Sequence, residues 1–404
     1  MPPARRDLLK AALAAPALLA GHAFAAPAAG GNRLLVVFLR GAYDAANIIA
    51  PVASDFYHQA RPTLALARPD PANADAALPL DADWGLHPAL KDSILPLWQA
   101  GQIAFVPFAG TEDMSRSHFE TQDTIELGQP LGATRDYGSG FMARLAGVLG
   151  ASASAIAFTE QLPLVFRGGA MVPNIALAGN GKPALDARQA GLVRQMYAGQ
   201  HLAGVDLAAA VDTGFAVRDT VYRTIAEEMT AAGRGAISAR GFELAARRIG
   251  VLMRQTYNLA FVDVGGWDTH VNQGGAQGYL AGRIGELGRA LAGFAEEIGP
   301  AAWRTTTVVV VSEFGRTFRE NGDKGTDHGH GSIYWVLGGS VRGGRMAGPQ
   351  VRIGADTLNQ NRDLPVLTDY RALIGGLLAR QYGLSPSQIA RVFPGAVPVD
   401  LGLV

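Results

Sequence analysis

The sequence predicts a three-layer α/β protein with a largely parallel central sheet. Short apolar segments alternate along the chain with segments whose apolar periodicity fits helices, the pattern of strands connected by helices. The segments 33–39, 259–264 and 305–312 are rich in Val, Leu and Phe, which indicates buried strands. Polar residues that can bind a metal lie at the carboxyl ends of these strands, where open α/β sheets build their sites.

The individual elements follow from the same patterns in chain order. The expected strands are 33–39, 102–108, 154–158, 163–166, 259–264, 305–312 and 332–337. The expected helices are 89–99, a stretch from about 118 to 126, 185–198, 216–232, 239–256, 277–297, 368–382 and 386–392. We expect one domain over 31–404, with cap or lid insertions near 51–90, which is rich in Pro and Asp, and near 150–235, which is rich in Ala and Gly.

Composition narrows the class of protein. The 404 residues are 48% hydrophobic and 17% charged, which indicates a compact globular chain. Lys+Arg and Asp+Glu number 35 each, so nothing favours nucleic acid as a partner. The chain has no cysteine, which excludes disulfides, thiolate metal ligands and a cysteine nucleophile. No long apolar segment follows the N-terminal one, so we expect a mature form that does not span a membrane.

Residues 1–25 resemble a twin-arginine signal peptide. The pair Arg5-Arg6 precedes a moderately apolar, Ala-rich run that Pro16 interrupts, and an Ala-x-Ala sequence occupies 23–25. A Sec signal or an uncleaved anchor is the alternative. We expect cleavage after Ala25, the twin-arginine translocase as a partner during export, and a periplasmic or secreted mature protein.

Three segments carry the residues that suggest a metal site. Asp263, Asp268 and His270 belong to the end of the 259–264 strand and the loop after it, and Glu313 directly follows the next strand. The segment 327–331, Asp-His-Gly-His-Gly, precedes the expected strand at 332–337. Carboxylates and imidazoles that meet at one sheet edge are typical ligands of a divalent ion. The sequence therefore predicts a metal site, and with it hydrolysis or group transfer.

Each segment also has a plainer interpretation. The segment 263–270 can be a solvated loop with a helix-capping Asp, and Glu313 can cap the next element or pair with Arg316. The segment 327–331 can be a simple loop. The glycines at 265–266 favour a site, because they let the backbone turn tightly and come close to a ligand.

The order of these residues resembles the alkaline phosphatase/sulfatase superfamily. There, a first strand ends in an Asp, as at Asp44, and a later strand is followed by two acidic residues five positions apart, as Asp263 and Asp268 are. A valine-rich strand then ends in an acidic ligand, matched by Glu313, and a final histidine before a strand is matched by His328. The resemblance implies a three-layer fold with metal ions held at strand ends.

A closer resemblance covers essentially the whole chain after the signal. The phrases at 38–44, 265–270, 312–317 and 326–331 are similar to a bacterial family, domain of unknown function 1501, whose members usually carry twin-arginine signals. With this resemblance, the predicted metal ligands are Asp44, Asp268, His270, Glu313, His328 and His330. Zinc, manganese and magnesium are not distinguished by such a set.

The chain departs from the superfamily pattern at two places. A superfamily histidine follows the second Asp by four residues, whereas His270 follows Asp268 by two and position 272 is Asn272. The acidic residue after the valine strand is followed there by His, and here by Phe314. One of the superfamily's two metal sites is therefore expected to be remodelled, to hold a different ion or to be missing.

The superfamily also implies a nucleophile at the start of a helix, where amides and the helix dipole favour an anionic ester. Ser117 is the first choice in this chain, with Ser115 and Thr111 as alternatives. Arg116 or Arg40 can hold a phosphate or sulfate oxygen in two hydrogen bonds. Ser117 can equally be a helix N-cap, because Glu120 follows it in a Ser-x-x-Glu capping box.

Two functions remain from the sequence. The first is an exported, metal-dependent hydrolase of phosphoric or sulfuric esters, acting on a small-molecule or polymeric ester. The residues around Ser115 do not match the signature of sulfatases that use formylglycine. The second is a metal-containing binding or assembly protein on the same scaffold, without turnover. The sequence does not identify the substrate.

Overall fold

The computed structural model describes residues 31–169, 172–177, 187–202, 205–209, 211–212 and 241–404. The predicted signal peptide at 1–25 and the predicted helix at 216–232 lie outside these residues. Within them, no helix combines the length and the apolar character needed to cross a bilayer.

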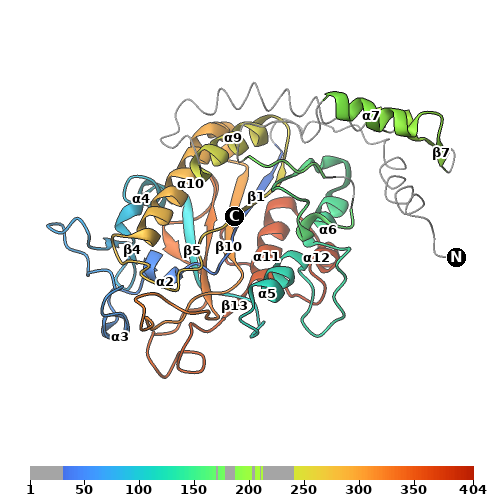
Figure 1. Ribbon diagram of the computed structural model, residues 1–404. Coiled ribbons are helices and arrows are strands. Elements are labelled where there is room, and N and C mark those ends of the chain that lie inside the picture. The colour runs from blue at the N-terminus through green and yellow to red at the C-terminus, as the bar shows by residue number, and fades with distance from the viewer. Residues whose placement is uncertain (1–30, 170–171, 178–186, 203–204, 210, 213–240) are drawn as a thin grey trace.

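An eight-stranded sheet forms the middle layer of the molecule (Figure 1). Its order is β12 (Arg345–Met346), β5 (Ile103–Gly110), β11 (Ser332–Leu337), β10 (Thr306–Ser312), β1 (Arg33–Leu39), β9 (Leu259–Val264) and β6 (Ala155–Phe158), and β13 (Thr368–Asp369) also pairs with β5. All pairs are parallel except those of β11, which is antiparallel to β10 and β5. The predicted α/β class with a largely parallel sheet is confirmed.

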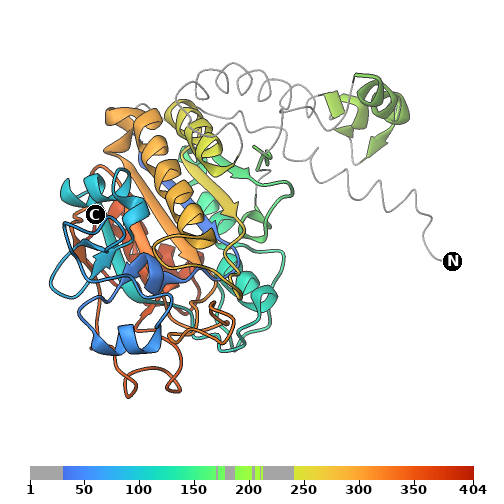
Figure 2. The same ribbon diagram turned by 60° about the vertical axis from the view of Figure 1, so that its left-hand side comes forward.

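Helices cover both faces of this sheet (Figures 1 and 2). One face is packed by α4 (Ile94–Gln99), α9 (Phe242–Gln255) and α10 (Tyr279–Trp303). The other is packed by α5 (His118–Leu127), α6 (Phe141–Leu149), α11 (Tyr370–Tyr382) and α12 (Pro386–Val392). The result is the predicted three-layer sandwich.

Alternation along the strands divides the core in two. In β1, Leu35, Val37 and Leu39 belong to the cluster shared with α9 and α10, while Leu34, Val36 and Phe38 belong to the cluster shared with α11 and α12. Successive side chains of a strand point to opposite faces, so a strand covered on both sides must be apolar throughout. This requirement explains why the runs of β-branched residues in the sequence predict buried strands.

Small elements fill the connections. Residues after β1 form α2 (Ala45–Ile48), β2 (Ile49–Ala50), α3 (Asp55–Ala60), β3 (Leu78–Pro79), β4 (Gly85–Leu86) and a 3-10 helix at Pro88–Leu90, and β2, β4 and β3 make a three-stranded sheet. The predicted insertion at 150–235 contains 3-10 helices at Gly150–Ser152 and Leu164–Phe166, then α7 (Ala187–Tyr197), β7 (His201–Leu202) and β8 (Val205–Asp206).

Two element predictions are wrong, and α6 was not predicted at all. Residues 164–166 form a 3-10 helix in place of the strand expected at 163–166. The helix expected at 89–99 is split into the 3-10 turn at 88–90 and α4, which begins at Ile94. Pro96 has no N–H and fits only the first turn of a helix, where no intrahelical acceptor is required, so α4 starts just before it.

Candidate metal centre

The ends of β1, β9 and β10 lie side by side. Leu39 is in register with Val264 on one side and with Ser312 on the other. Gly41, at φ +111°, comes so close to the next loop that a Cβ there would lie 2.7 Å from the Asp268 nitrogen. The loops after three parallel strands therefore meet at one edge of the sheet, as parallel topology requires.

Three imidazoles meet the carboxylate of Asp268 at this edge. The Nε2 atom of His328 lies 2.9 Å from His118 Nε2 and 3.2 Å from His270 Nε2. Asp268 Oδ1 is 2.9 Å from His270 Nε2 and 3.4 Å from His328 Nε2, and Oδ2 is 3.6 Å from His118 Nε2. Ligands at about 2.0–2.1 Å from a tetrahedral zinc ion are separated by roughly 3.3 Å, which resembles these spacings.

One set of three residues fits a shared ion directly. His118, Asp268 and His328 each offer one ligand atom, and these atoms all lie within 4.8 Å of one another. Side-chain exposures of 21% for His118, 28% for His328 and 45% for Asp268 leave this set reachable from solvent. An open, three-residue set of this kind is typical of catalytic metal sites, which keep a position for substrate or water.

Hydrogen bonds fix the orientation of each imidazole. The Nδ1 atoms of His118, His270 and His328 lie 2.8 Å from Glu313 Oε1, 3.1 Å from Asp327 Oδ1 and 3.0 Å from the Arg116 carbonyl oxygen. All three partners only accept, so in the neutral imidazole Nδ1 carries the proton and Nε2 keeps a lone pair. The Nε2 lone pairs of His118 and His328, 2.9 Å apart, repel each other unless one ring carries a second proton or a cation lies between them. Such Nδ1 contacts are the usual support of metal-binding histidines, so the residues fit a metal ion.

The electrostatic surroundings keep the Asp268 carboxylate ionised and the His328 imidazole neutral. Burial raises the pKa of Asp268, but the Arg316 guanidinium and the imidazoles outweigh it and hold that pKa below its usual value. Burial and the neighbouring His118 lower the pKa of His328. The hydrogen bond to Glu313 raises the pKa of His118 despite partial burial. Asp268 and His328 are thus in the protonation states that bind a cation.

Glu313 supports the cluster from behind. Its side chain is fully buried, and Oε1 accepts from the Gly41 amide and from Gln122 Nε2, each at 2.8 Å, as well as from His118. Burial raises the pKa of Glu313, and these hydrogen bonds more than compensate, so the pKa is lowered. Glu313 was predicted as a metal ligand, and that role stays a prediction; in the structure its Oε1 lies 2.8 Å from His118 Nδ1.

Asp44 and His330, two further predicted ligands, each have polar neighbours other than the residues of the cluster. Arg61 donates to both carboxylate oxygens of Asp44, at 2.6 and 2.9 Å, and Gln273 Nε2 donates at 2.6 Å. These contacts are buried and occupy both oxygens, so they do not support the predicted role of Asp44 as a ligand. His330 is 7% exposed, and burial lowers its pKa while Asp363 acts in the opposite direction.

The predicted nucleophile stands at the start of α5. Ser117 is its N-cap, and the Ser117 hydroxyl accepts from the Glu120 amide at 3.5 Å. Ser115 Oγ lies 3.3 Å from Thr121 Oγ1, and the Thr111 hydroxyl accepts from the Asp113 amide. The N-cap interpretation of Ser117 is therefore confirmed, but its own amide donates to Ser115 Oγ at 3.3 Å in place of the Glu120 side chain that a capping box requires. The role of Ser117 as a nucleophile stays a prediction.

Both arginines considered for the substrate are held by carboxylates. Arg116 donates to Asp363 Oδ2 from Nε and Nη2, at 3.1 and 2.7 Å. Its backbone has φ +52°, an uncommon value for a side chain of this size, and its carbonyl is the acceptor for His328. Arg40 donates to Asp263 at 2.6 Å and to Glu126 at 2.7 Å.

Sequence reasoning missed two residues of the site. His118 directly follows Ser117, and a hydroxyl at a helix start is the more usual candidate for a reactive group there. Arg316 was considered only as a partner of Glu313, yet its fully buried guanidinium bonds to Asp268. The signal for His118 was its place at a predicted helix start beside the sheet edge, which is where the superfamily pattern expects a reactive group.

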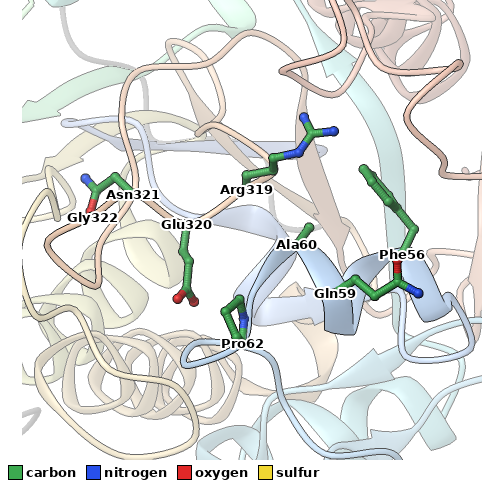
Figure 3. Close-up of a pocket in the computed structure, with 8 residues that line it drawn as sticks. All are labelled: Phe56, Gln59, Ala60, Pro62, Arg319, Glu320, Asn321 and Gly322. Atoms are coloured by element: carbon green, nitrogen blue, oxygen red, sulfur yellow. The ribbon is translucent and has the colours of Figure 1, made fainter.

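A separate pocket lies between α3 and the segment 319–322 (Figure 3). The close-up shows Arg319 and Phe56 on one side and Glu320 nearer Pro62. The Glu320 carboxylate accepts from the amides of Thr63 and Leu64, and the Arg319 guanidinium lies 5.2 Å from the Phe56 ring centre. These polar groups already have protein partners, and none of the cluster residues lines the pocket.

Fold and site together define an α/β protein with a candidate metal centre at the carboxyl edge of its sheet. The chain belongs to the family described as "Protein of unknown function (DUF1501)", whose sequence model matches residues 31–393. A crystal structure of a protein in the alkaline phosphatase superfamily from Vibrio parahaemolyticus is similar at 12% identity and a TM-score of 0.35, over 84% of this chain and 71% of that one. Comparison with curated proteins gives no match.

Proposed function

We propose that this protein is a metal-dependent hydrolase of phosphoric or sulfuric esters, exported to the periplasm or beyond the cell. One observation supports the proposal of a bound metal ion. Three imidazoles have their Nδ1 atoms bound to acceptors, so that their Nε2 atoms converge on the Asp268 carboxylate. The order of the site segments along the chain, which resembles the alkaline phosphatase/sulfatase superfamily, supports the choice of ester chemistry.

His118, Asp268 and His328 would hold the ion. Two imidazoles and one carboxylate suit zinc better than magnesium, which prefers oxygen ligands and keeps its waters. A divalent ion bound there would act as a Lewis acid on an ester oxygen. Glu313 keeps the His118 ring oriented through Nδ1, and the Arg116 carbonyl does the same for His328.

The function is tested with purified full-length protein and a panel of phosphate and sulfate esters. The protein is assayed with zinc, manganese and magnesium, and its bound metal is measured by plasma mass spectrometry. We expect His328→Ala to lose the ion and to lower kcat/KM by about 100-fold or more, because the Lewis acid contributes several kcal/mol. His58→Ala is the matched control, since His58 hydrogen-bonds to the Val52 carbonyl and packs on the Tyr57 ring, without contact to the cluster.

Ser117→Ala separates two routes to the same products. Loss of turnover with the ion retained identifies the serine hydroxyl as the nucleophile. Turnover that persists, with a stability loss of about 1 kcal/mol from the missing cap, points to attack by water.

A non-catalytic metal protein is the second candidate, and one observation favours it. Arg40 and Arg116 are both committed to ion pairs, whereas anion-binding enzymes usually aim such groups at the substrate. An ion bound at full occupancy, with no turnover of any ester in the panel, would decide for this candidate.

A further inference from the structure

We infer that the centre holds one divalent ion and that the Arg316 guanidinium supplies the second positive charge of the site. This inference rests on the proposed metal site of His118, Asp268 and His328. It concerns the number of ions and the choice between two overlapping ligand sets, which the distances alone leave open.

Two sets of three residues have spacings that suit a metal ion. The first is His118, Asp268 and His328. The second is His270, Asp268 and His328, whose nearest atoms are separated by 2.9, 3.2 and 3.4 Å. Asp268 could serve both through its two oxygens, since Oδ2 faces His118 and Oδ1 faces His270. A centre with two ions would use both sets.

Arg316 already occupies the side of Asp268 that faces His270. Its side chain is fully buried, and Nη2 donates to Asp268 Oδ1 while Nη1 lies 3.4 Å from His270 Nε2. The remaining donors bond to four backbone carbonyls, those of Gly41, Ala42, Trp267 and Thr326. With every donor directed at the protein, the guanidinium is a fixed part of the site and has no N–H left over for a substrate.

A second ion cannot share this position. An arginine keeps its charge at all physiological pH values, so a divalent ion between Asp268 Oδ1 and His270 Nε2 would face a buried like charge at close range. The N–H of Arg316 also points at the lone pair of His270 that an ion would need. His118 Nε2 instead faces Asp268 Oδ2 and His328 Nε2. The ion therefore belongs to the His118 set.

Phe314 agrees with this assignment. It stands where the superfamily pattern has a histidine, and it packs its ring on the rings of His118 and His328, with centres 5.0 and 5.3 Å apart. An apolar ring at that position cannot bind an ion, and it supports two imidazoles that do. Of the three outcomes expected for the second metal site, the structure thus favours its absence, with Arg316 in its place.

The experiment counts ions in the three histidine variants. Full-length protein is stripped with a chelator, dialysed against increasing Zn²⁺ and analysed by plasma mass spectrometry. Wild type should saturate at one Zn²⁺ per chain. His118→Ala and His328→Ala should each weaken binding by 100-fold or more, whereas His270→Ala should still bind one Zn²⁺ within a few-fold of the wild-type affinity.

Charge variants of Arg316 provide a second measurement. Arg316→Gln removes the charge and should admit a second, weaker Zn²⁺, while Arg316→Lys should stay at one. If circular dichroism shows that neither variant folds, the comparison of Zn²⁺ binding by the three histidine variants still tests the inference.

Two Zn²⁺ in wild type, or loss of the single Zn²⁺ in His270→Ala, would overturn the inference and leave a metal-dependent function standing. No Zn²⁺ in wild type would overturn the metal site and the inference with it.

Discussion

At the scale of the residue, each imidazole of the cluster is held by its own acceptor. Glu313 holds His118, and Asp327 holds His270. Only the first of these pairs belongs to the proposed metal set. The two carboxylates can therefore be compared, because they make the same kind of hydrogen bond to a proposed ligand and to a histidine outside the proposed set.

Glu313→Gln should lower the Zn²⁺ affinity by about 10–100-fold, the usual effect of altering the partner of a metal-binding histidine. The amide cannot accept from Gly41, Gln122 and His118 as the carboxylate does. Asp327→Asn, the matched control, should leave the affinity within a few-fold of wild type. Isothermal titration with Zn²⁺ measures both, and equal losses in the two variants would contradict the assignment of His118 over His270.

Residue types at strand ends were enough to predict much of the site. Asp268, His270, Glu313 and His328 were named from the sequence, and the structure gathers all four at one edge. Their individual contacts were not predictable, because a carboxylate that binds an ion and one that orients an imidazole look the same in sequence. His118 was not predicted as part of the site, because it lies in a helix and its partner Glu313 is 195 positions away in the sequence.

At the scale of the element, a buried ion pair attaches α3 to the loops around it. The Arg61 guanidinium follows α3 and bonds to Asp44, and it also donates to the carbonyls of Thr317 and Phe318. Both side chains are almost fully buried, at 0% and 1% exposure. The segments after β1, α3 and β10 are thus connected through one guanidinium.

Asp44→Asn should lower the free energy of unfolding by about 3–5 kcal/mol, because it leaves the Arg61 charge buried and uncompensated. Asp55→Asn, at the start of α3, is the control, since its pair with Arg68 is exposed and its loss should cost less than about 1 kcal/mol. Urea denaturation measures both. The Zn²⁺ content of folded Asp44→Asn should equal that of wild type, and a selective loss of the ion would support the predicted role of Asp44 as a ligand.

Elements were predictable where burial alone decides them. The strands at 33–39, 259–264 and 332–337 were predicted with the bounds that the structure has, because both faces demand apolar residues. The antiparallel direction of β11 was not predicted, since direction depends on how the chain returns to the sheet. The short apolar run at 163–166 fits a strand and a 3-10 turn equally well.

At the scale of the whole molecule, buried tyrosines make the stability of the core depend on pH. Tyr43, Tyr57, Tyr257, Tyr334, Tyr370 and Tyr382 all have their pKa raised by burial. For Tyr57 and Tyr257 the pKa rises from 10.0 to about 12. With no disulfide to restrain the unfolded chain, stability rests on this packing.

The fold should therefore lose stability steeply between pH 10 and 12. A tyrosine whose pKa is raised in the folded state contributes its full stability below pH 10, and loses it as the unfolded chain ionises first. Each such group changes the free energy of unfolding by about 1.4 kcal/mol per pH unit in this range. Tyr257→Phe should reduce the slope by up to that amount. Urea melts across this range measure the slope, and a Tyr257→Phe variant whose slope equals that of the wild type would contradict the expectation.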